Sequence, residues 1–204
     1  NEIEEGLFVN YGNELLPGDI VKINASIIIY IAQPIVTVNT NLMISSYLEG
    51  TFLNRAIELY NTSDEMIDLS NFKLALYLDG SESVGVTIDL DGFLLAKSVY
   101  VIAHENSSES ILSKADMTTP NLIFNGNDAV ALKYYNNVTV DMVGNIGWGF
   151  YYLNDRTLVR GESVSEVNVF FDINEWDEYR SDYDAILGIH PTQYPTTFTF
   201  DPAF

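Results

Sequence analysis

Two stretches decide the fold: residues 54–61 read NRAIELYN, and residues 72–79 read FKLALYLD. In the first stretch, Ile57 and Leu59 alternate with Glu58 and Tyr60. In the second, leucines alternate with Lys73 and other residues. A period of two places successive side chains on opposite faces of a β-strand. We therefore expect two strands, each with one face toward an apolar core and the other toward solvent.

Similar apolar patterns recur along the chain and are separated by turn-forming pairs. Further strands are expected at residues 99–103, 129–134, 139–143 and 157–160. The Asp-Gly, Asn-Gly and Asn-Asn pairs between them favour tight turns, and residues 134–139 have the composition of a hairpin. One short surface helix is expected at residues 107–115, capped by Asn106. Many short strands at this spacing predict an all-β fold, an antiparallel sandwich or barrel.

Composition and charge exclude several classes of function. The chain has 204 residues and no cysteine, with 29 acidic and 9 basic residues and a net charge of -20. Its 47% of hydrophobic residues distinguishes it from a disordered acidic tail. The basic residues form no stripe, so direct binding of nucleic acid is not expected. The longest apolar run, residues 25–32, falls short of the roughly 20 residues of a membrane span.

Several short motifs follow one another in a fixed order. They are Ile44–Gly50, Asn54–Asn61, Ile67–Leu74, Phe124–Leu132, Asp141–Gly144, Arg156–Arg160 and Glu175–Trp176. In this order they resemble the lamin tail domain family, an Ig-like module also found in many bacterial secreted and surface proteins. The sequence departs from the bacterial pattern at Ser46, often Glu, at Asn71, often Gly, and at Arg55, usually Lys. The resemblance covers about residues 42–190 and implies an Ig-like antiparallel β-sandwich.

The same resemblance carries expectations about organisation and function. It implies a binding or architectural role without an activity of its own, in a larger protein that often carries a nuclease or other hydrolase domain. We expect a non-catalytic module, extracellular or at the cell surface, that positions neighbouring domains or binds a protein or glycan partner. Residues 1–41 are predicted to be a β-rich segment, loosely similar to the end of an OB-like barrel. Residues 191–204 are predicted to be an extended linker.

Three charged residues are the first candidates for a site. On the strand order that the resemblance implies, Glu49 and Glu58 approach each other with Arg55 between them. One interpretation is an ion network that locks two strand ends. A second is a calcium site formed by Glu49, Glu58 and Asp128, since calcium takes six to eight oxygen ligands. A third is a solvated face without a role. The metal interpretation leaves open a cation-dependent hydrolase or a calcium-stabilised adhesion module.

The two histidines, His104 and His190, show no pattern typical of catalysis. Neither stands at zinc-ligand spacing from another histidine, and the chain has no nucleophile elbow or phosphate-binding loop. We therefore expect no catalytic histidine and no resident cofactor.

Aromatic residues gather in one expected loop. Residues 148–152 read WGFYY, so Trp148, Phe150, Tyr151 and Tyr152 occupy four of five positions. They either plug one end of the sandwich or form an exposed patch for a glycan or protein partner. Trp176 is instead expected in the core.

Overall fold

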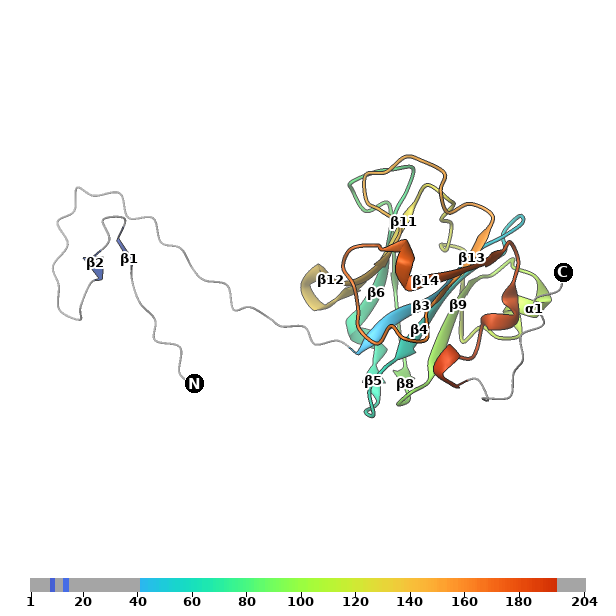
Figure 1. Ribbon diagram of the computed structural model, residues 1–204, viewed down its shortest axis with the longest axis horizontal. Coiled ribbons are helices and arrows are strands. Elements are labelled where there is room, and N and C mark those ends of the chain that lie inside the picture. Colours follow the sequence, from blue (N-terminus) through green and yellow to red (C-terminus); the bar gives the residue numbers. More distant parts are fainter. Residues whose placement is uncertain (1–7, 10–12, 15–40, 194–204) are drawn as a thin grey trace. The chain divides into compact units, whose positions relative to one another are not determined.

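The computed structural model describes residues 8–9, 13–14 and 41–193 and divides the chain into two compact units, Asn1–Thr37 and Val38–Phe204 (Figure 1). In the first unit, β1 (Phe8–Val9) pairs antiparallel with β2 (Asn13–Glu14). The rest of the predicted OB-like segment lies outside the described residues. Of the predicted C-terminal linker, the structure describes Pro191–Gln193, a 3₁₀ turn.

Two main sheets and one small ribbon lie in the described part of the second unit. The larger has the order β10-β9-β4-β3-β13-β14 and the smaller has the order β12-β11-β6-β7. The larger contains β10 (Met117–Thr119), β9 (Val99–His104), β4 (Arg55–Asn61), β3 (Leu42–Glu49), β13 (Arg156–Arg160) and β14 (Trp176–Arg180). The smaller contains β12 (Val138–Val143), β11 (Ala129–Tyr134), β6 (Phe72–Tyr77) and β7 (Val86–Asp89). A ribbon of β5 (Ile67–Asp68) and β8 (Phe93–Leu94) completes the described strands.

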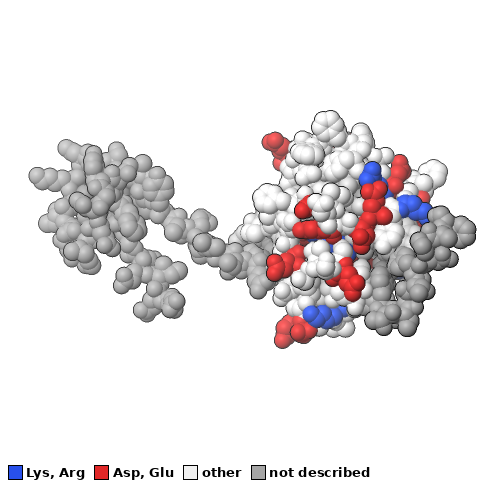
Figure 2. Space-filling model, in the orientation of Figure 1, with Lys and Arg blue, Asp and Glu red and all other residues white. Residues whose placement is uncertain are grey.

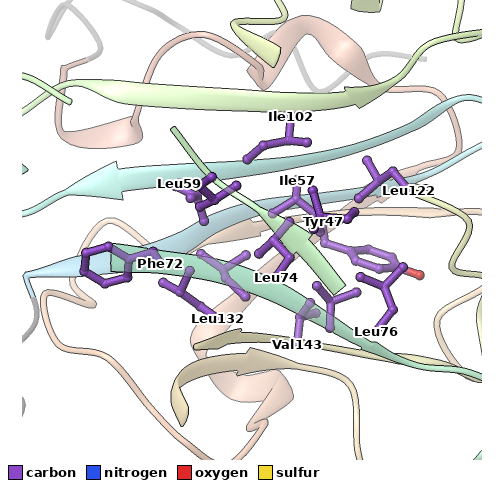
Figure 3. Packing of buried hydrophobic residues seen from close by; sticks show 14 of the residues in the cluster. Tyr47, Ile57, Leu59, Phe72, Leu74, Leu76, Ile102, Leu122, Leu132 and Val143 are labelled. Carbon is purple, nitrogen blue, oxygen red and sulfur yellow. The ribbon is translucent and has the colours of Figure 1, made fainter. Parts of the chain in front are cut away.

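The core lies between the two sheets. Tyr47 and Ile57 from the larger sheet pack with Leu74 and Leu132 from the smaller one (Figure 3). All four side chains are at most 1% exposed. Within the larger sheet only the β9–β10 pair is parallel. The predicted all-β sandwich is therefore confirmed, and so are the strands expected from the alternating pattern.

The turns follow the chemistry read from the sequence. Asn136 and Asn137 connect β11 to β12 with φ angles of 59° and 65°. Asp79 and Gly80, which follow β6, have φ angles of 54° and 69°. Asparagine, aspartate and glycine tolerate this left-handed region better than other residues. The predicted hairpin at residues 134–139 is confirmed.

The predicted helix is present but shorter than expected. α1 spans Glu109–Leu112, and its N-cap residue is Ser108, which makes no side-chain cap hydrogen bond. The expectation that Asn106 caps it was wrong, because residues 105–107 form a turn in which the Ser107 N–H donates to the His104 carbonyl. No helix in the described part of the chain is long and apolar enough to cross a membrane.

The outer face of the larger sheet is covered by the chain itself. Residues 181–190, here called the C-terminal strap, include the 3₁₀ turn η4 (Asp184–Ile186). Ile186 and Leu187 pack with Leu48 and Ala56 on this face. Glu58, which the alternation placed toward solvent, is consequently 0% exposed. The prediction of a solvated outer face on β4 was wrong because the strap covers it.

Candidate functional site

Glu49 and Arg55 face each other across the β3–β4 pair. Burial raises the pKa of Glu49, while the Asp155 N–H and the charge of Arg55 oppose that rise. The Glu49 Oε2 accepts the hydrogen bond from the Asp155 N–H. Arg55 donates to the carbonyls of Phe52 and Phe124. Each side chain therefore holds a neighbouring loop, and no ion pair joins the two within residues 41–193.

Asp128 also serves the loops at this end of the sandwich. Its carboxylate accepts hydrogen bonds from the Asp79 N–H at 2.5 Å and from the Asn125 N–H at 2.7 Å. Burial raises the pKa of Asp128, and these two N–H groups lower it. The carboxylate thereby joins the turn after β6 to the turn before β11.

Glu58 lies on the opposite face of the sheet from Glu49. Its carboxylate accepts hydrogen bonds from the Ser45 hydroxyl at 2.8 Å and from the Gly188 N–H at 2.7 Å. The Ser46 hydroxyl is a third donor, at 3.3 Å. Burial raises the pKa of Glu58 to about 7, against the effect of these hydrogen bonds.

This placement corrects both interpretations that grouped Glu58 with Glu49. Glu49 is paired with Arg55, and Arg55 stands three positions from Glu58, so strand alternation sends the two carboxylates to opposite faces. The predicted network of Glu49, Arg55 and Glu58 and the predicted calcium set of Glu49, Glu58 and Asp128 were therefore wrong. In the described ranges no three His, Cys, Asp or Glu residues are grouped so that they could hold a metal ion.

A melting experiment with calcium tests this correction. Because the three predicted ligands do not converge, we expect the same melting temperature in millimolar calcium and in excess chelator. A cation that binds only the folded state would raise the melting temperature with its concentration. A rise that disappears in Glu49→Gln but persists in the exposed control Asp64→Asn would restore a metal site at Glu49.

One buried and extensively bonded charged group was not among the site residues predicted from the sequence. Arg160 is 1% exposed and donates to both carboxylate oxygens of Asp141 at 2.6 Å. It also donates to Glu175, and its guanidinium lies 4.3 Å from the centre of the Trp176 ring. Asp141 further accepts the N–H groups of Ile44 and Asn168 at 2.7 and 3.0 Å.

These contacts, here called the Arg160 clamp, connect parts of both sheets. Asp141 comes from β12 of the smaller sheet, whereas Ile44 and Arg160 come from β3 and β13 of the larger one. Burial raises the pKa of Asp141, and Arg160 lowers it. A signal was present in the sequence, since an aspartate inside the apolar run Val138–Val143 requires a partner when buried. Because the charged groups of the clamp bond one another and the backbone, we interpret the clamp as a structural feature.

The aromatic loop (residues 144–155) joins β12 to β13 and lies near the turn after β6, at the upper end of the domain in Figure 1. Trp148, Phe150 and Tyr151 are 55%, 76% and 63% exposed. Tyr152 is half-buried and packs against Phe171. Tyr152 therefore fits the interpretation that the loop plugs one end of the sandwich. The other three rings fit the interpretation of an exposed patch.

The histidines occupy separate structural positions. His104 is buried at the end of β9 and accepts the Asn106 N–H at its Nδ1. His190 stacks on Tyr60 with ring centres 3.8 Å apart, and its Nδ1 lies 2.9 Å from the Thr192 hydroxyl. Burial lowers the pKa of His190 to about 4. Both rings thus stabilise chain segments.

Comparison with known proteins identifies the family of the chain. None of the curated proteins compared with the chain matches it. The family model described as Lamin Tail Domain matches residues 36–147, more than half of the 204 residues. This span contains β3 to β12 and the beginning of the aromatic loop, while β13, β14 and the strap follow it. The predicted span of residues 42–190 extended further toward the C-terminus. With the order of motifs, the sandwich and this match in agreement, the chain belongs to the lamin tail domain family.

Proposed function

We propose that the domain is a non-catalytic binding module whose contact surface is formed by Trp148, Phe150 and Tyr151. In the larger protein it would hold a protein or glycan partner and position the neighbouring domains, outside the cell or at its surface. The observation that carries the proposal is the exposure of these three rings on one loop. Aromatic side chains supply large contact areas in binding sites, and exposed apolar patches mark such sites.

The loop has a defined shape. The hydroxyl of Tyr152 accepts the Asn145 N–H at 2.5 Å, and the N–H groups of Tyr152 and Leu153 both donate to the Gly126 carbonyl. A Cβ atom at Gly80 would lie 2.6 Å from the backbone of Gly149, so the turn after β6 packs directly against the loop. A preorganised surface binds at a lower entropic cost than a loop that must order first.

A paired substitution tests the proposal. The full chain, Trp148→Ser/Phe150→Ser and the control Phe93→Ser would be applied to panels of oligosaccharides and of peptides. Phe93 is 64% exposed on β8, at the opposite end of the domain in Figure 1. We expect at least one panel member to be retained by the wild type and by the control but lost by the aromatic variant. Equal retention of every bound member by all three proteins would contradict the proposal.

The hydrolase alternative has its own test. A screen for hydrolysis with magnesium, calcium or manganese is expected to show no turnover by the full chain. Turnover that is lost in Glu49→Ala or Glu58→Ala would establish the cation-dependent enzyme instead.

A further inference from the structure

Acidic residues stand on the aromatic loop and on the turn that packs against it. Glu82 lies beside Gly147, since a Cβ atom at Gly147 would be 3.4 Å from the Glu82 Cγ. Asp79 begins the turn that packs on the loop, and Asp155 ends the loop. All three carboxylate-bearing residues are exposed.

None of these three carboxylates takes part in an ion pair within residues 41–193. Residues 78–85 and 144–155 contain no lysine or arginine. The five ion pairs in the described part of the chain involve other acids. The surface therefore combines aromatic rings with carboxylates that form no ion pair, while Arg156, the residue after the loop, pairs with Glu178.

The charge of the whole chain has the same sign. It has a net charge of -20, and Figure 2 shows Asp and Glu side chains spread over the visible face with few Lys or Arg among them. Such a field accelerates the approach of cations and repels anions.

From these observations we infer that the ligand of the aromatic loop is a polypeptide segment that presents lysine or arginine. The cationic group lies on the face of an exposed ring and forms an ion pair with a neighbouring carboxylate such as Glu82. Cations are attracted to the faces of tryptophan and tyrosine, and a carboxylate adds a charge-assisted hydrogen bond. This inference rests on the proposed function and names the partner chemistry of the same surface.

The charge pattern favours this partner over a neutral glycan. A sugar hydroxyl group both donates and accepts hydrogen bonds, whereas the ionised groups at this surface only accept. The amide of Asn145 already donates to the Tyr152 hydroxyl. A cation satisfies the acceptors and neutralises the charge at the same time.

Titration of the full chain with three probes tests the inference. The probes are a short peptide of alternating lysine and glycine, its glutamate–glycine counterpart, and a linear neutral oligosaccharide. We expect the lysine peptide alone to bind, with an affinity that falls about tenfold between low and physiological ionic strength. Trp148→Ser/Phe150→Ser is expected to weaken it at least fivefold, which corresponds to one exposed cation–π contact of about 1 kcal/mol. Glu82→Gln should weaken binding and reduce the salt dependence, whereas Phe93→Ser should change neither.

Three results would overturn the inference, and each differs in what it means for the proposed function. Equal binding of the lysine peptide to Trp148→Ser/Phe150→Ser, whose net charge is unchanged, would show attraction by the whole acidic surface only. Binding of the oligosaccharide instead, lost in that variant, would keep the aromatic binding surface and replace its partner. If no probe binds and the aromatic variant behaves like wild type on the panels described above, both the inference and the proposed function fail.

Discussion

Asp141→Ala is expected to lower the free energy of unfolding by about 3–5 kcal/mol, the cost of breaking a buried ion pair by removing one partner. The substitution removes both hydrogen bonds from Arg160 at 2.6 Å and leaves the Ile44 and Asn168 N–H groups without that acceptor. An unsatisfied buried donor adds about 1–3 kcal/mol of its own. Glu175 then remains the one carboxylate bonded to the guanidinium, beside the Ile44 carbonyl and the Trp176 ring.

Denaturant unfolding followed by tryptophan fluorescence measures this loss, because Trp176 packs on Arg160. The control is Asp64→Ala, which removes an ion pair with Lys97 at 3.4 Å whose aspartate is 91% exposed. Exposed pairs contribute about 0–1 kcal/mol, so the control should differ little from wild type. A loss at Asp141 no larger than that at Asp64 would show that the clamp does not stabilise the sandwich.

Two further variants separate the charge from the shape. Asp141→Asn keeps the size and one acceptor oxygen, so its loss should lie between those of wild type and Asp141→Ala. Asp141→Leu combined with Arg160→Met replaces the buried pair by apolar side chains, and such replacements are often neutral or stabilising. The double variant is therefore expected to be more stable than Asp141→Ala.

The inside of the sandwich could be predicted from the sequence because it depends on local alternation. Ile57 and Leu59 in one strand, and Leu74 and Leu76 in another, stand two positions apart, and a strand with that pattern buries one face. Asn136-Asn137 and Asp79-Gly80 specify their turns in the same local manner. These features need no knowledge of distant segments, and the structure confirmed them.

The outer face of β4 depends on a distant segment and was missed for that reason. Alternation separates Glu58 from Ile57 but does not tell whether something covers Glu58. The cover comes from Ile186 and Leu187, about 130 positions further along the chain, and the Gly188 N–H binds the Glu58 carboxylate. The same holds for the Arg160 clamp, whose acids come from β12 and from the residue before β14.

The aromatic loop was located correctly, while its exposure required the structure. WGFYY in a loop is equally consistent with a plug and with a binding surface. Only the packing shows that Tyr152 is turned toward Phe171 and that Trp148 and Phe150 remain exposed.

Glu58→Gln is expected to remove a pH-dependent penalty in the stability of the domain. Burial raises the pKa of Glu58 from its ordinary 4.5 to about 7, so the folded state binds a proton between these values that the unfolded state releases. The resulting stability is fully present below pH 4.5 and is lost as pH rises through 7. The free energy of unfolding falls by about 3 kcal/mol in total, because each unit of difference between the folded and unfolded pKa corresponds to about 1.36 kcal/mol.

The measurement is the difference in unfolding free energy between wild type and Glu58→Gln from pH 4.5 to 8. Ser45 and Gly188 donate to different oxygens of Glu58, so glutamine keeps an acceptor for one of them, and it does not titrate. We expect wild type to lose stability relative to the variant steadily as pH rises through this range. Asp64→Asn, an exposed carboxylate, is the control and should give a flat difference. A flat difference for Glu58→Gln as well would show that Glu58 is ionised in the folded state at all these pH values.

His190 should show the opposite dependence. Burial lowers its pKa from 6.5 to about 4, so the unfolded state binds a proton in this range that the folded state does not. The stability from His190 is therefore present above pH 6.5 and is lost as pH falls through 4. His190→Phe keeps the stacking on Tyr60 without titrating, and wild type should lose stability relative to it on acidification. Between pH 4.5 and 6.5 the effects of Glu58 and His190 on the stability of the wild type have opposite signs. Each single variant removes one effect and therefore shows the pH dependence of the other.

One substitution shows whether the strap causes both pKa shifts. Gly188 has a φ of 90°, and its N–H donates to Glu58. Proline can neither adopt that angle nor donate, so Gly188→Pro should detach this part of the strap. If the strap buries both groups, NMR titration of Gly188→Pro will move the pKa of Glu58 down and that of His190 up, each toward its ordinary value. Recovery of the pKa of His190 alone would assign the shift of Glu58 to burial against the sheet beneath it, since the hydrogen bonds from Ser45 and Ser46 lower its pKa.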